Sequence, residues 1–402
     1  MNNGLELIKS ISQQSPSKIV LVVLDGLGGL PDPQTGNTEL ETARTPNLDE
    51  LTVKGVCGLT TTVGPGITPG SAPGHLALFG YDPVDCIIGR GILEAVGIGF
   101  DLLPGDVAAR GNFGTIDDSG LVIDRRAGRI SNEECTRLCG LLNGVVIEGV
   151  DIFVRSVREH RFVIVLRGEG LSADVTDSDP QQLGTAPREV TPVTPDAGKT
   201  SRLVNQFIAQ AKLTLAPHHP ANTVLLRGFS QHPHLPTMNE IYKLNPAVIA
   251  SYPMYRGLAK LAGMEVLETG AGIEDEFITL KQNYNRYDFF FLHIKGTDSA
   301  GEDGDFARKV SVIEQVDKAI TALTALNPDV IAVTGDHSTP ALLKGHSWHP
   351  VPLLLYSKWC RADGVKEFSE SACIHGGLGH IPATQLMPLA MANALKLTKY
   401  GA

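Results

Sequence analysis

The amino-acid sequence predicts an α/β fold, a mostly parallel sheet sandwiched by helices, with a smaller α+β domain inserted into it. Three observations predict this fold. Apolar runs of strand length alternate with amphipathic runs of helix length, which is typical of a parallel sheet covered by helices. The alternation stops near residue 103 and resumes near residue 240. The 402 residues also exceed what one compact core holds, so more than one domain is expected.

The elements of the larger domain can be assigned in order along the chain. Its first strand is expected at residues 18–25, KIVLVVLD, which is apolar on both faces, as a central parallel strand is. A helix should begin at Thr45-Pro46, because threonine favours the N-cap and proline the first turn. Later elements follow from the same patterns: strands at 287–295, 329–337 and 351–357, and helices at 253–263, 306–323 and 383–397. These segments predict one discontinuous domain, residues 1–102 with 240–402.

Residues 103–239 form the predicted inserted domain. They contain many arginines and short strand candidates such as RFVIVLRG and NTVLLRG. Helices are expected at 131–142 and 201–213, and the Pro- and Asp-rich stretch between them is typical of a loop. This mixture of short strands and helices favours an α+β arrangement.

Composition and charge exclude several classes of function. The formal net charge is −10 and there is no basic block, which argues against binding nucleic acid or an anionic membrane surface. No run of about 18 apolar residues could cross a bilayer, and the N-terminal MNNGLELIKS lacks the apolar core of a signal peptide. Six scattered cysteines without a CxxC pair indicate reduced thiols. We therefore expect a cytoplasmic protein that acts on a small molecule, and its oligomeric state is left open.

Acidic residues follow three of the apolar strands. Asp25 ends the first strand, Asp298 follows the second, and Asp336 with His337 ends the third. Parallel α/β sheets bind their ligands at the carboxyl ends of the strands, so these side chains should converge on one edge. A single Asp after a strand is usually a turn residue or a helix cap. Three such positions, one of them followed by His, favour a shared site instead.

His346 is the fourth element of this expected cluster. It precedes the strand at 351–357, so it reaches the same edge only if that strand is antiparallel to its neighbours. His349 is a competitor three residues further on. Carboxylates and imidazoles together suit Mn²⁺, Zn²⁺ or Mg²⁺. Two such ions about 4 Å apart can hold the attacking and leaving oxygens of a phosphoryl transfer.

Ser71 lies in the loop TPGSAPGH, ahead of the apolar run HLALFG. The glycines and prolines favour a sharp, exposed turn, and free N–H groups of a following helix would attract a phosphate. A serine hydroxyl is a weak nucleophile unless a base or a metal lowers its pKa. No Ser-His-acid arrangement is evident, so metal coordination is the expected means of activation. Outside such a site, a serine in this kind of loop is only a turn residue.

Motifs along nearly the whole chain are similar to those of one known family. They are VVLDGLGG at 22–29, ARTPNLD at 43–49, GSAPGHLALFGYDP at 70–83, GRGILEAVG at 89–97, DRRAGRI at 124–130, EHR at 159–161, DSDP at 177–180, TGDHSTP at 334–340 and HSWHPVP at 346–352. On these motifs the chain resembles the archaeal-type 2,3-bisphosphoglycerate-independent phosphoglycerate mutases, within the alkaline phosphatase superfamily. The motif at 70–83 is long and specific. The resemblance implies an alkaline-phosphatase-like fold and an isomerase of glycolysis and gluconeogenesis that interconverts 3-phosphoglycerate and 2-phosphoglycerate without 2,3-bisphosphoglycerate.

The resemblance also implies two divalent metal ions, Mn²⁺ or Mg²⁺ in preference to Co²⁺ or Zn²⁺. The residues that match the ligands of one ion are Asp25, Ser71, Asp336 and His337, and those that match ligands of the other are Asp298 and His346. The family pattern is Asp-x-x-x-His, whereas this chain has Glu302 four residues after Asp298. Glutamate also binds metals, so Glu302 is carried over as a ligand. If the segment SAGEDGD is an open turn rather than a helix, Asp303 or Asp305 could compete with Glu302.

The mechanism that the resemblance implies has two halves. Ser71 takes the phosphoryl group, the bound glycerate reorients, and its other hydroxyl takes the group back. Arg256 matches a basic position that faces the phosphoryl group. The inserted domain should bind the substrate, and the candidates are Arg126, Arg129, Arg158, His160, Arg161 and Asp179. Asp177 is assigned as the acid–base residue, although the sequence does not separate it from Asp179 or His160. The family follows the DP of DSDP with histidine, where this chain has Gln181.

Three other functions stay open. A phosphatase would use the same serine and metals but pass the phosphoryl group to water. A mutase or hydrolase for another phosphorylated or phosphonate acid would keep the metal core and vary the inserted domain. A non-catalytic binding protein is favoured only by Glu302 and Gln181. A mutase equilibrates the phosphoglycerates without releasing phosphate, a phosphatase releases phosphate, and a binding protein does neither.

Overall fold

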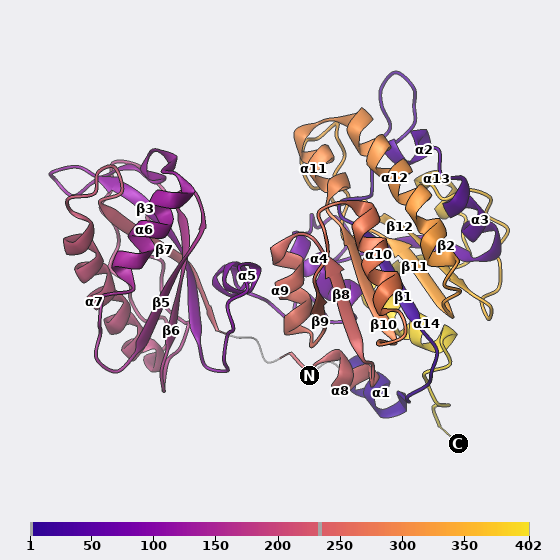
Figure 1. Ribbon diagram of the computed structural model, residues 1–402, viewed down its shortest axis with the longest axis horizontal. Coiled ribbons are helices and arrows are strands. Elements are labelled where there is room, and N and C mark those ends of the chain that lie inside the picture. Colours follow the sequence, from indigo (N-terminus) through magenta and orange to yellow (C-terminus); the bar gives the residue numbers. More distant parts are fainter. Residues whose placement is uncertain (1–2, 232–234, 402) are drawn as a thin grey trace. The chain divides into compact units, whose positions relative to one another are not determined.

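The computed structural model describes residues 3–231 and 235–401, which form two compact units (Figure 1). The first unit comprises Met1–Ile87 with Leu235–Ala402, and the second comprises Ile88–His234. The sequence placed the first crossing between the units at residue 102, whereas the second unit begins earlier, at Ile88. The reason is that helix α5, Arg90–Gly97, packs on strand β3, Val107–Ile116, and so belongs to the second unit.

The first unit is built on an eight-stranded sheet in the order β13-β2-β12-β11-β1-β10-β8-β9. In chain order the strands are β1 Ile19–Leu24, β2 Val56–Thr61, β8 Pro246–Ala250, β9 Glu265–Leu267, β10 Phe289–Ile294, β11 Val330–Thr334, β12 Val351–Ser357 and β13 Gly379–Pro382. β1 lies between β10 and β11 and is parallel to both, whereas β12 is antiparallel to β11 and to β2. All four strands predicted here are confirmed. The sequence missed β2, β8, β9 and β13. β9 and β13 have only three and four residues, and β2, β9 and β13 carry polar residues.

Helices surround this sheet. They are α1 Asn3–Ile11, α2 Glu39–Thr42, α3 Pro46–Lys54, α4 Ser71–Leu78, α8 Met238–Tyr242, α9 Pro253–Leu261, α10 Ile273–Asn283, α11 Gly296–Asp303, α12 Phe306–Thr324, α13 Glu370–Cys373, the 3-10 helix η3 Ala383–Gln385 and α14 Leu386–Asn393. Thr45 precedes α3 as predicted, but its side chain makes no capping hydrogen bond. The helix predicted at 383–397 is shorter than expected, because its first turn is η3 and α14 ends at Asn393.

The central strands β1, β10 and β11 are buried along their whole length. Consecutive strand residues point to opposite sides, so both faces of the sheet are covered at these strands. Phe290 of β10 joins a core that includes Ile313 and Ile320 of α12. Phe291, the next residue, packs edge-on against Phe79 at the end of α4, with ring centroids 4.9 Å apart. Burying each such side chain stabilises the fold by about 1.5–3 kcal/mol. These apolar layers hold the ends of β1, β10 and β11 in place.

The second unit is an antiparallel sheet with its own helices. Its elements are α5, β3, β4 Val122–Asp124, η1 Ala127–Arg129, α6 Asn132–Leu142, β5 Asp151–Arg158, β6 Arg161–Arg167, η2 Pro195–Ala197, α7 Gly198–Leu215 and β7 Thr223–Gln231. The strand order is β4-β3-β6-β5, and β7 pairs with β3. Leu138 of α6 and Phe207 of α7 share a core with Phe162 of β6. One large, mostly parallel sheet and one antiparallel sheet confirm the predicted fold class.

Among residues 3–231 and 235–401, no helix is both long enough and apolar enough to span a membrane.

Candidate functional site

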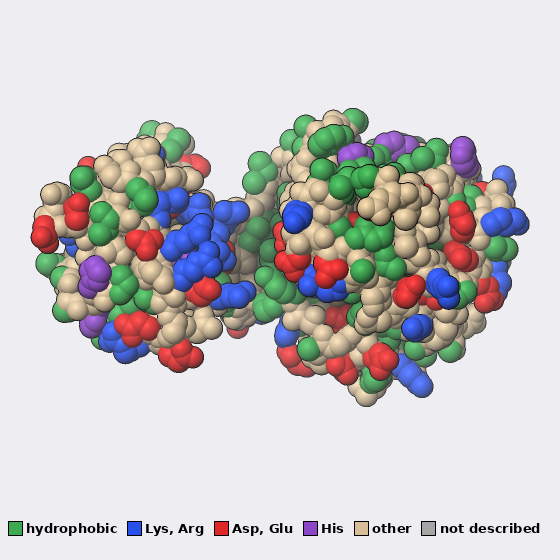
Figure 2. Space-filling view, turned by 90° about the horizontal axis from the view of Figure 1, so that it is seen from above, with side chains coloured by type: hydrophobic (Ala, Val, Ile, Leu, Met, Phe, Trp, Pro, Cys, Tyr) green, Lys and Arg blue, Asp and Glu red, His purple; other side chains and the backbone are tan. Residues whose placement is uncertain are grey.

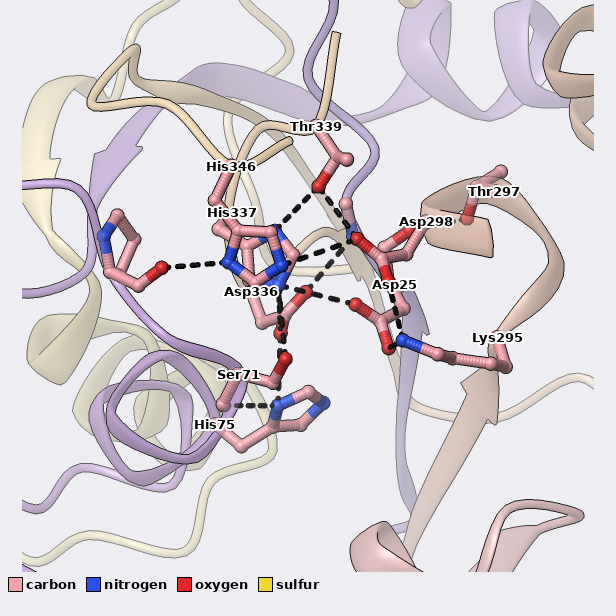
Figure 3. A network of polar contacts seen from close by, with 12 residues as sticks. Asp25, Ser71, His75, Lys295, Thr297, Asp298, Asp336, His337, Thr339 and His346 are labelled. Atoms are coloured by element: carbon pink, nitrogen blue, oxygen red, sulfur yellow. Dashed lines mark hydrogen bonds and ion pairs between the residues drawn. The ribbon is translucent and has the colours of Figure 1, made fainter. Parts of the chain in front are cut away.

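The candidate site lies where β1, β10 and β11 end. Asp25 directly follows β1, Asp298 lies in the first turn of α11 after β10, and Asp336 with His337 follows β11. Because these strands are parallel neighbours, the residues that follow them reach one edge of the sheet. Figure 3 shows their side chains pointing toward one another, with His346 and Ser71 beside them.

Two groups of side chains could each hold a metal ion. Asp25, Asp336 and His337 each offer an atom within 4.8 Å of the others, and so do Asp298, His337 and His346. His337 belongs to both groups. The sequence assigned His337 only to the group of Asp25 and Asp336, because spacing along the chain cannot show that its ring also reaches Asp298.

The first group fits a divalent cation on its chemistry. Nε2 of His337 lies 3.3 Å from Oδ1 of Asp25 and 3.2 Å from Oδ2 of Asp336. Neither oxygen has a hydrogen-bond partner in the described part of the chain, although both side chains are fully buried. Converging buried carboxylates are costly without a cation between them. Oxygen and imidazole donors of this kind suit Mn²⁺, Mg²⁺ or Zn²⁺.

Ser71 is the first residue of α4 and points into this group. Its Oγ lies 3.2 Å from Nε2 of His337. Gly74, one turn further on, lies against the loop after β11, because a Cβ there would approach the carbonyl oxygen of Asp336 to 2.4 Å. His75 donates from Nδ1 to the carbonyl of Ser71 at 2.8 Å. Tight packing of α4 on this loop therefore fixes the position of the serine hydroxyl.

His346 reaches the site from the opposite direction. It precedes β12, and β12 is antiparallel to β11, so the condition that the sequence set for His346 is met. Its Nδ1 donates to the carbonyl of Pro69 at 2.9 Å, which leaves Nε2 free, 3.5 Å from Oδ1 of Asp298. Its ring stacks on the ring of His337, with the two ring centroids 3.7 Å apart. The competitor His349 instead contacts the hydroxyl of Ser347, at 3.0 Å.

Glu302 lies at the edge of the second group. The segment SAGEDGD is helical up to Asp303, so Glu302 follows Asp298 by about one turn of α11. Its Oε1 is 3.9 Å from Nε2 of His346, and its side chain is 55% exposed. Of its possible competitors, Asp303 pairs with Arg308 and Asp305 caps α12. Metal binding by Glu302 stays a prediction.

Lys295 is a site residue that sequence reasoning missed. Its Nζ contacts Oδ2 of Asp298 and lies 3.0 Å from Oδ2 of Asp25, so its ammonium bridges the two groups. Burial alone would lower the pKa of Lys295, but the charges of Asp25 and Asp298 outweigh it and raise that pKa. The available signal was its place at the end of a predicted strand, three residues before Asp298.

Buried aromatic rings lie behind Asp25 on the inner side of the site. His293 is fully buried, stacks on Tyr255 at 3.6 Å, and places Nε2 3.2 Å from Oδ2 of Asp25. Burial would raise the pKa of Asp25. The hydrogen bond and charge of His293, together with Lys295 and His337, outweigh burial and hold that pKa well below its usual range. Burial lowers the pKa of His337 despite the nearby carboxylates. The site thus combines an ionised carboxylate with a neutral imidazole.

Arg256 lies on α9, next to Tyr255. Its guanidinium pairs with the exposed carboxylate of Glu268. The pair engages Nη2 of Arg256 alone, and the contact with the phosphoryl group that the sequence assigned to Arg256 stays a prediction.

The second unit contains the predicted substrate residues. Arg126, Arg129, Arg158 and Arg161 are exposed, and Figure 2 shows Lys and Arg side chains gathered on part of this unit's surface. Arg158 and Arg161 are paired across the turn between β5 and β6. These four arginines are thus accessible to a small anion.

The other predicted residues of this unit have internal partners or are buried. Asp179 is buried and accepts two hydrogen bonds from Arg125, at 2.7 and 3.0 Å. Asp177 accepts from the backbone N–H of Gly228 at 2.8 Å. His160 is buried, and burial with the charge of Arg161 lowers the pKa of His160 to about 4.

Arg110 and Arg227 were missed by sequence reasoning. They lie opposite each other on β3 and β7, and the buried Nε atom of each has no hydrogen-bond partner in the described residues. Burial, with neighbouring arginines, lowers the pKa of Arg110 to about 10. The carboxylates nearest to them are Glu94, 3.4 Å from Nη1 of Arg110, and Asp179, 3.9 Å from Nε of Arg227. An arginine within each of two apolar strand candidates was the available signal, because a guanidinium group within a sheet requires an anion.

The chain is similar to known proteins of one family. The family model described as 2,3-bisphosphoglycerate-independent phosphoglycerate mutase matches residues 53–222. A Thermus thermophilus protein named as a probable member is 51% identical, over 98% of this chain and 99% of its own. A Thermotoga maritima protein of the same name is 50% identical, over 99% of both chains.

Two solved structures are similar to this chain in fold and sequence. The cofactor-independent phosphoglycerate mutase of Thermoplasma acidophilum has a TM-score of 0.79 and 30% identity, covering 94% of this chain and 100% of its own. A protein from Pyrococcus horikoshii has a TM-score of 0.82 and 29% identity, covering 97% of this chain and 100% of its own.

Proposed function

This chain belongs to the 2,3-bisphosphoglycerate-independent phosphoglycerate mutase family and is an isomerase, and we propose that it interconverts 3-phosphoglycerate and 2-phosphoglycerate through a phosphoserine at Ser71. The observation that carries the proposal is the position of the Ser71 hydroxyl. It lies 3.2 Å from Nε2 of His337, at the point where buried oxygens of Asp25 and Asp336 also converge. A serine at the mouth of an anionic, cation-binding cluster is suited to accept a phosphoryl group.

The residues fit two divalent ions. Asp25, Ser71, Asp336 and His337 would hold one ion, and Asp298, Glu302 and His346 the other, with His337 within reach of both. When bound, the ions would lower the pKa of the serine hydroxyl and neutralise charge on the phosphoryl oxygens. The excess of carboxylate oxygen favours Mn²⁺ or Mg²⁺ over Zn²⁺ or Co²⁺.

The phosphoryl group would be transferred in two steps, first to Ser71 and then back to the glycerate. Oγ of Ser71 forms a bond to phosphorus while the bond to the glycerate oxygen breaks, and the serine proton ends on the released hydroxyl. The other hydroxyl of the glycerate then attacks the phosphoserine, and the proton returns to Ser71. Lys295, whose ammonium already lies between Asp25 and Asp298, would hold the transferring oxygens from one side. Arg256, of which Glu268 engages only Nη2, would hold them from another.

Arginines of the second unit would hold the substrate. A guanidinium binds a carboxylate through two parallel hydrogen bonds, so Arg126, Arg129, Arg158 and Arg161 are candidates for the glycerate carboxylate. Arg110 and Arg227 add two guanidinium groups whose Nε atoms have no hydrogen-bond partner in the described residues, although Glu94 and Asp179 lie nearby.

Proton transfer to and from the glycerate hydroxyls is assigned to Asp177. Asp179 is less available because Arg125 engages both of its oxygens. His160, with a lowered pKa, would act as a neutral base.

The test is turnover with both products measured. Purified protein is incubated with Mn²⁺ and 3-phosphoglycerate, and 2-phosphoglycerate and free phosphate are followed together. The proposal expects 2-phosphoglycerate without phosphate. Stoichiometric phosphate would show a phosphatase, and no reaction would indicate a binding protein.

Replacement of the nucleophile tests the phosphoserine. Ser71→Ala should fold normally and lose at least about 1,000-fold in activity, because no other hydroxyl occupies that place. Acid-quenched wild type should carry phosphate on the peptide that contains Ser71. Retained turnover in the variant would show that the phosphoryl group never visits the serine.

A further inference from the structure

Thr339 links the two candidate metal groups through one hydroxyl. It lies two residues after His337 and is fully buried. Its Oγ1 donates to Oδ1 of Asp298 at 2.7 Å and lies 2.9 Å from Nδ1 of His337 (Figure 3). Asp298 belongs to the second group, and the Nε2 of His337 faces the first. A single side chain therefore touches both.

The direction of these hydrogen bonds determines where the imidazole proton lies. A threonine hydroxyl has one proton to donate, and an ionised carboxylate can only accept. The hydroxyl proton therefore goes to Asp298, and the lone pair of Oγ1 accepts the N–H from Nδ1 of His337. A neutral imidazole has one N–H, so in that form Nε2 of His337 carries no proton on the side of Ser71, Asp25 and Asp336. Only an imidazole nitrogen in that state can bind a metal.

The hydroxyl is held in place from several sides. The backbone N–H of Thr339 donates to the carbonyl of Gly28 at 3.0 Å. The buried ammonium of Lys309 donates to the carbonyls of both Thr339 and Gly28, at 2.9 and 3.0 Å. Gly26 has a φ of +66°, and a Cβ there would come within 2.5 Å of the Thr339 hydroxyl. The loops after β1 and β11 are thus joined at this residue, so the hydroxyl has little freedom to move.

We propose that Thr339 is a positioning residue that couples the two metal positions, setting the tautomer of His337 for one and the orientation of Asp298 for the other. The inference rests on the proposed two-ion site. A threonine that merely satisfied buried partners would affect stability alone. A coupling threonine also affects binding at both positions, because its loss frees the His337 ring and leaves Asp298 without a donor.

Thr339→Val removes the hydroxyl and keeps the shape of the side chain. The weaker of the two Mn²⁺ affinities should fall by about 10–100-fold, as is typical when a hydrogen-bond partner of a metal ligand is lost. Thr339→Ser restores the hydroxyl and should bind Mn²⁺ within about threefold of wild type. Thr52→Val is the matched control, since Thr52 is also fully buried but its hydroxyl has no hydrogen-bond partner in the described residues.

Binding is followed by electron paramagnetic resonance of Mn²⁺, which counts free ions and detects the exchange-coupled spectrum of two neighbouring ions. Wild type, Thr339→Ser and Thr52→Val should give the coupled spectrum at two equivalents, and Thr339→Val should not. Full-length wild type that binds no Mn²⁺ would overturn the proposed function together with this inference. Two ions bound equally well by wild type and Thr339→Val would overturn the role of Thr339 alone.

The tautomer is measured separately in metal-free protein. Long-range ¹⁵N–¹H spectra of histidine-labelled protein distinguish a proton on Nδ1 from one on Nε2, and the His337 signals are assigned from their loss in His337→Asn. Wild type and Thr339→Ser should carry the proton on Nδ1, and Thr339→Val should show a mixture. An unchanged His337 tautomer in Thr339→Val would overturn the proposal even if Mn²⁺ affinity fell.

Discussion

At the scale of single residues, Glu302 is, with Gln181, one of two positions where this chain departs from the family pattern that the resemblance implies. A histidine in its place would bring a neutral donor, whereas Glu302 brings a fourth carboxylate beside Asp25, Asp298 and Asp336. The four negative charges of these carboxylates equal the four positive charges of two divalent ions, even before the substrate binds. The extra carboxylate should favour oxygen-preferring ions and weaken the attraction for an anionic substrate. Cationic residues such as Lys295 would then have to neutralise more of the negative charge of the substrate.

We predict that Glu302→Ala loses one metal ion and most activity, and that Glu302→His keeps two ions with a changed metal preference. The reason is that Oε1 of Glu302 is 3.9 Å from Nε2 of His346, which leaves space for an ion between them. Metal content by elemental analysis, with turnover in Mn²⁺, Mg²⁺ and Zn²⁺, provides the measurement. Two ions in Glu302→Ala with normal activity would remove Glu302 from the site.

At the scale of elements, α10 buries a carboxylic acid that the proposed reaction does not use. Glu276 is 2% exposed, and its Oε2 has no hydrogen-bond partner in the described residues. Burial raises the pKa of Glu276 to about 8, although hydrogen bonds from Ser251 oppose the shift. The native state therefore favours the protonated acid, and the side chain acts as a neutral contact between α10 and the segment after β8.

This raised pKa predicts a dependence of stability on pH. The pKa of Glu276 is near 4.5 in the unfolded chain and about 8 in the native state. The native state is therefore stabilised fully below pH 4.5, and this stabilisation is lost as the pH rises through about 8, because the buried carboxyl must then ionise. The loss for Glu276 should be on the order of a few kcal/mol, and Glu276→Gln should remove most of it. Urea unfolding in EDTA between pH 5 and about 8.5 measures the effect. Glu274→Gln, an exposed change on the same helix, is the control, and equal slopes in all three proteins would contradict the prediction.

At the scale of the whole molecule, each unit has a core of its own. The apolar cluster of the second unit runs from Val107 to Leu226 and includes no residue of the first unit. The chain also enters and leaves this unit at neighbouring points, since a Cβ at Gly89 would come within 2.2 Å of the Cβ of Ser230, just before the end of β7. An insertion with adjacent ends and a separate core has what an independent domain requires.

The excised segment 88–234 is therefore expected to fold by itself. Its urea unfolding, followed by circular dichroism, should be a single cooperative transition, because small domains with one core unfold in that way. The control is the same segment with Phe207→Ala, which should be destabilised by about 3–5 kcal/mol through the cavity left in that core. A gradual, non-cooperative change in the excised segment would show that it depends on the rest of the chain.

The sequence by itself determined four strands of the first unit and the polar residues that follow three of them. Asp25, Asp336 and His337 were identified because an apolar run and the polar residue after it are neighbours in the chain. The motif around Ser71 was found for the same reason, and the resemblance that it carried to the phosphoglycerate mutases is confirmed. Such features are local, so they can be read without knowing which strands are adjacent.

Only the tertiary structure decided how these side chains combine. β1 lies between two strands that follow it by more than 250 residues, and this order brings Lys295 between two carboxylates. The antiparallel direction of β12 brings His346 to the same edge. The hydroxyl of Thr339 and the facing pair Arg110 and Arg227 depend likewise on strand pairing. Pairing joins residues far apart in the chain, and it is determined by the packing of the whole sheet rather than by any local pattern.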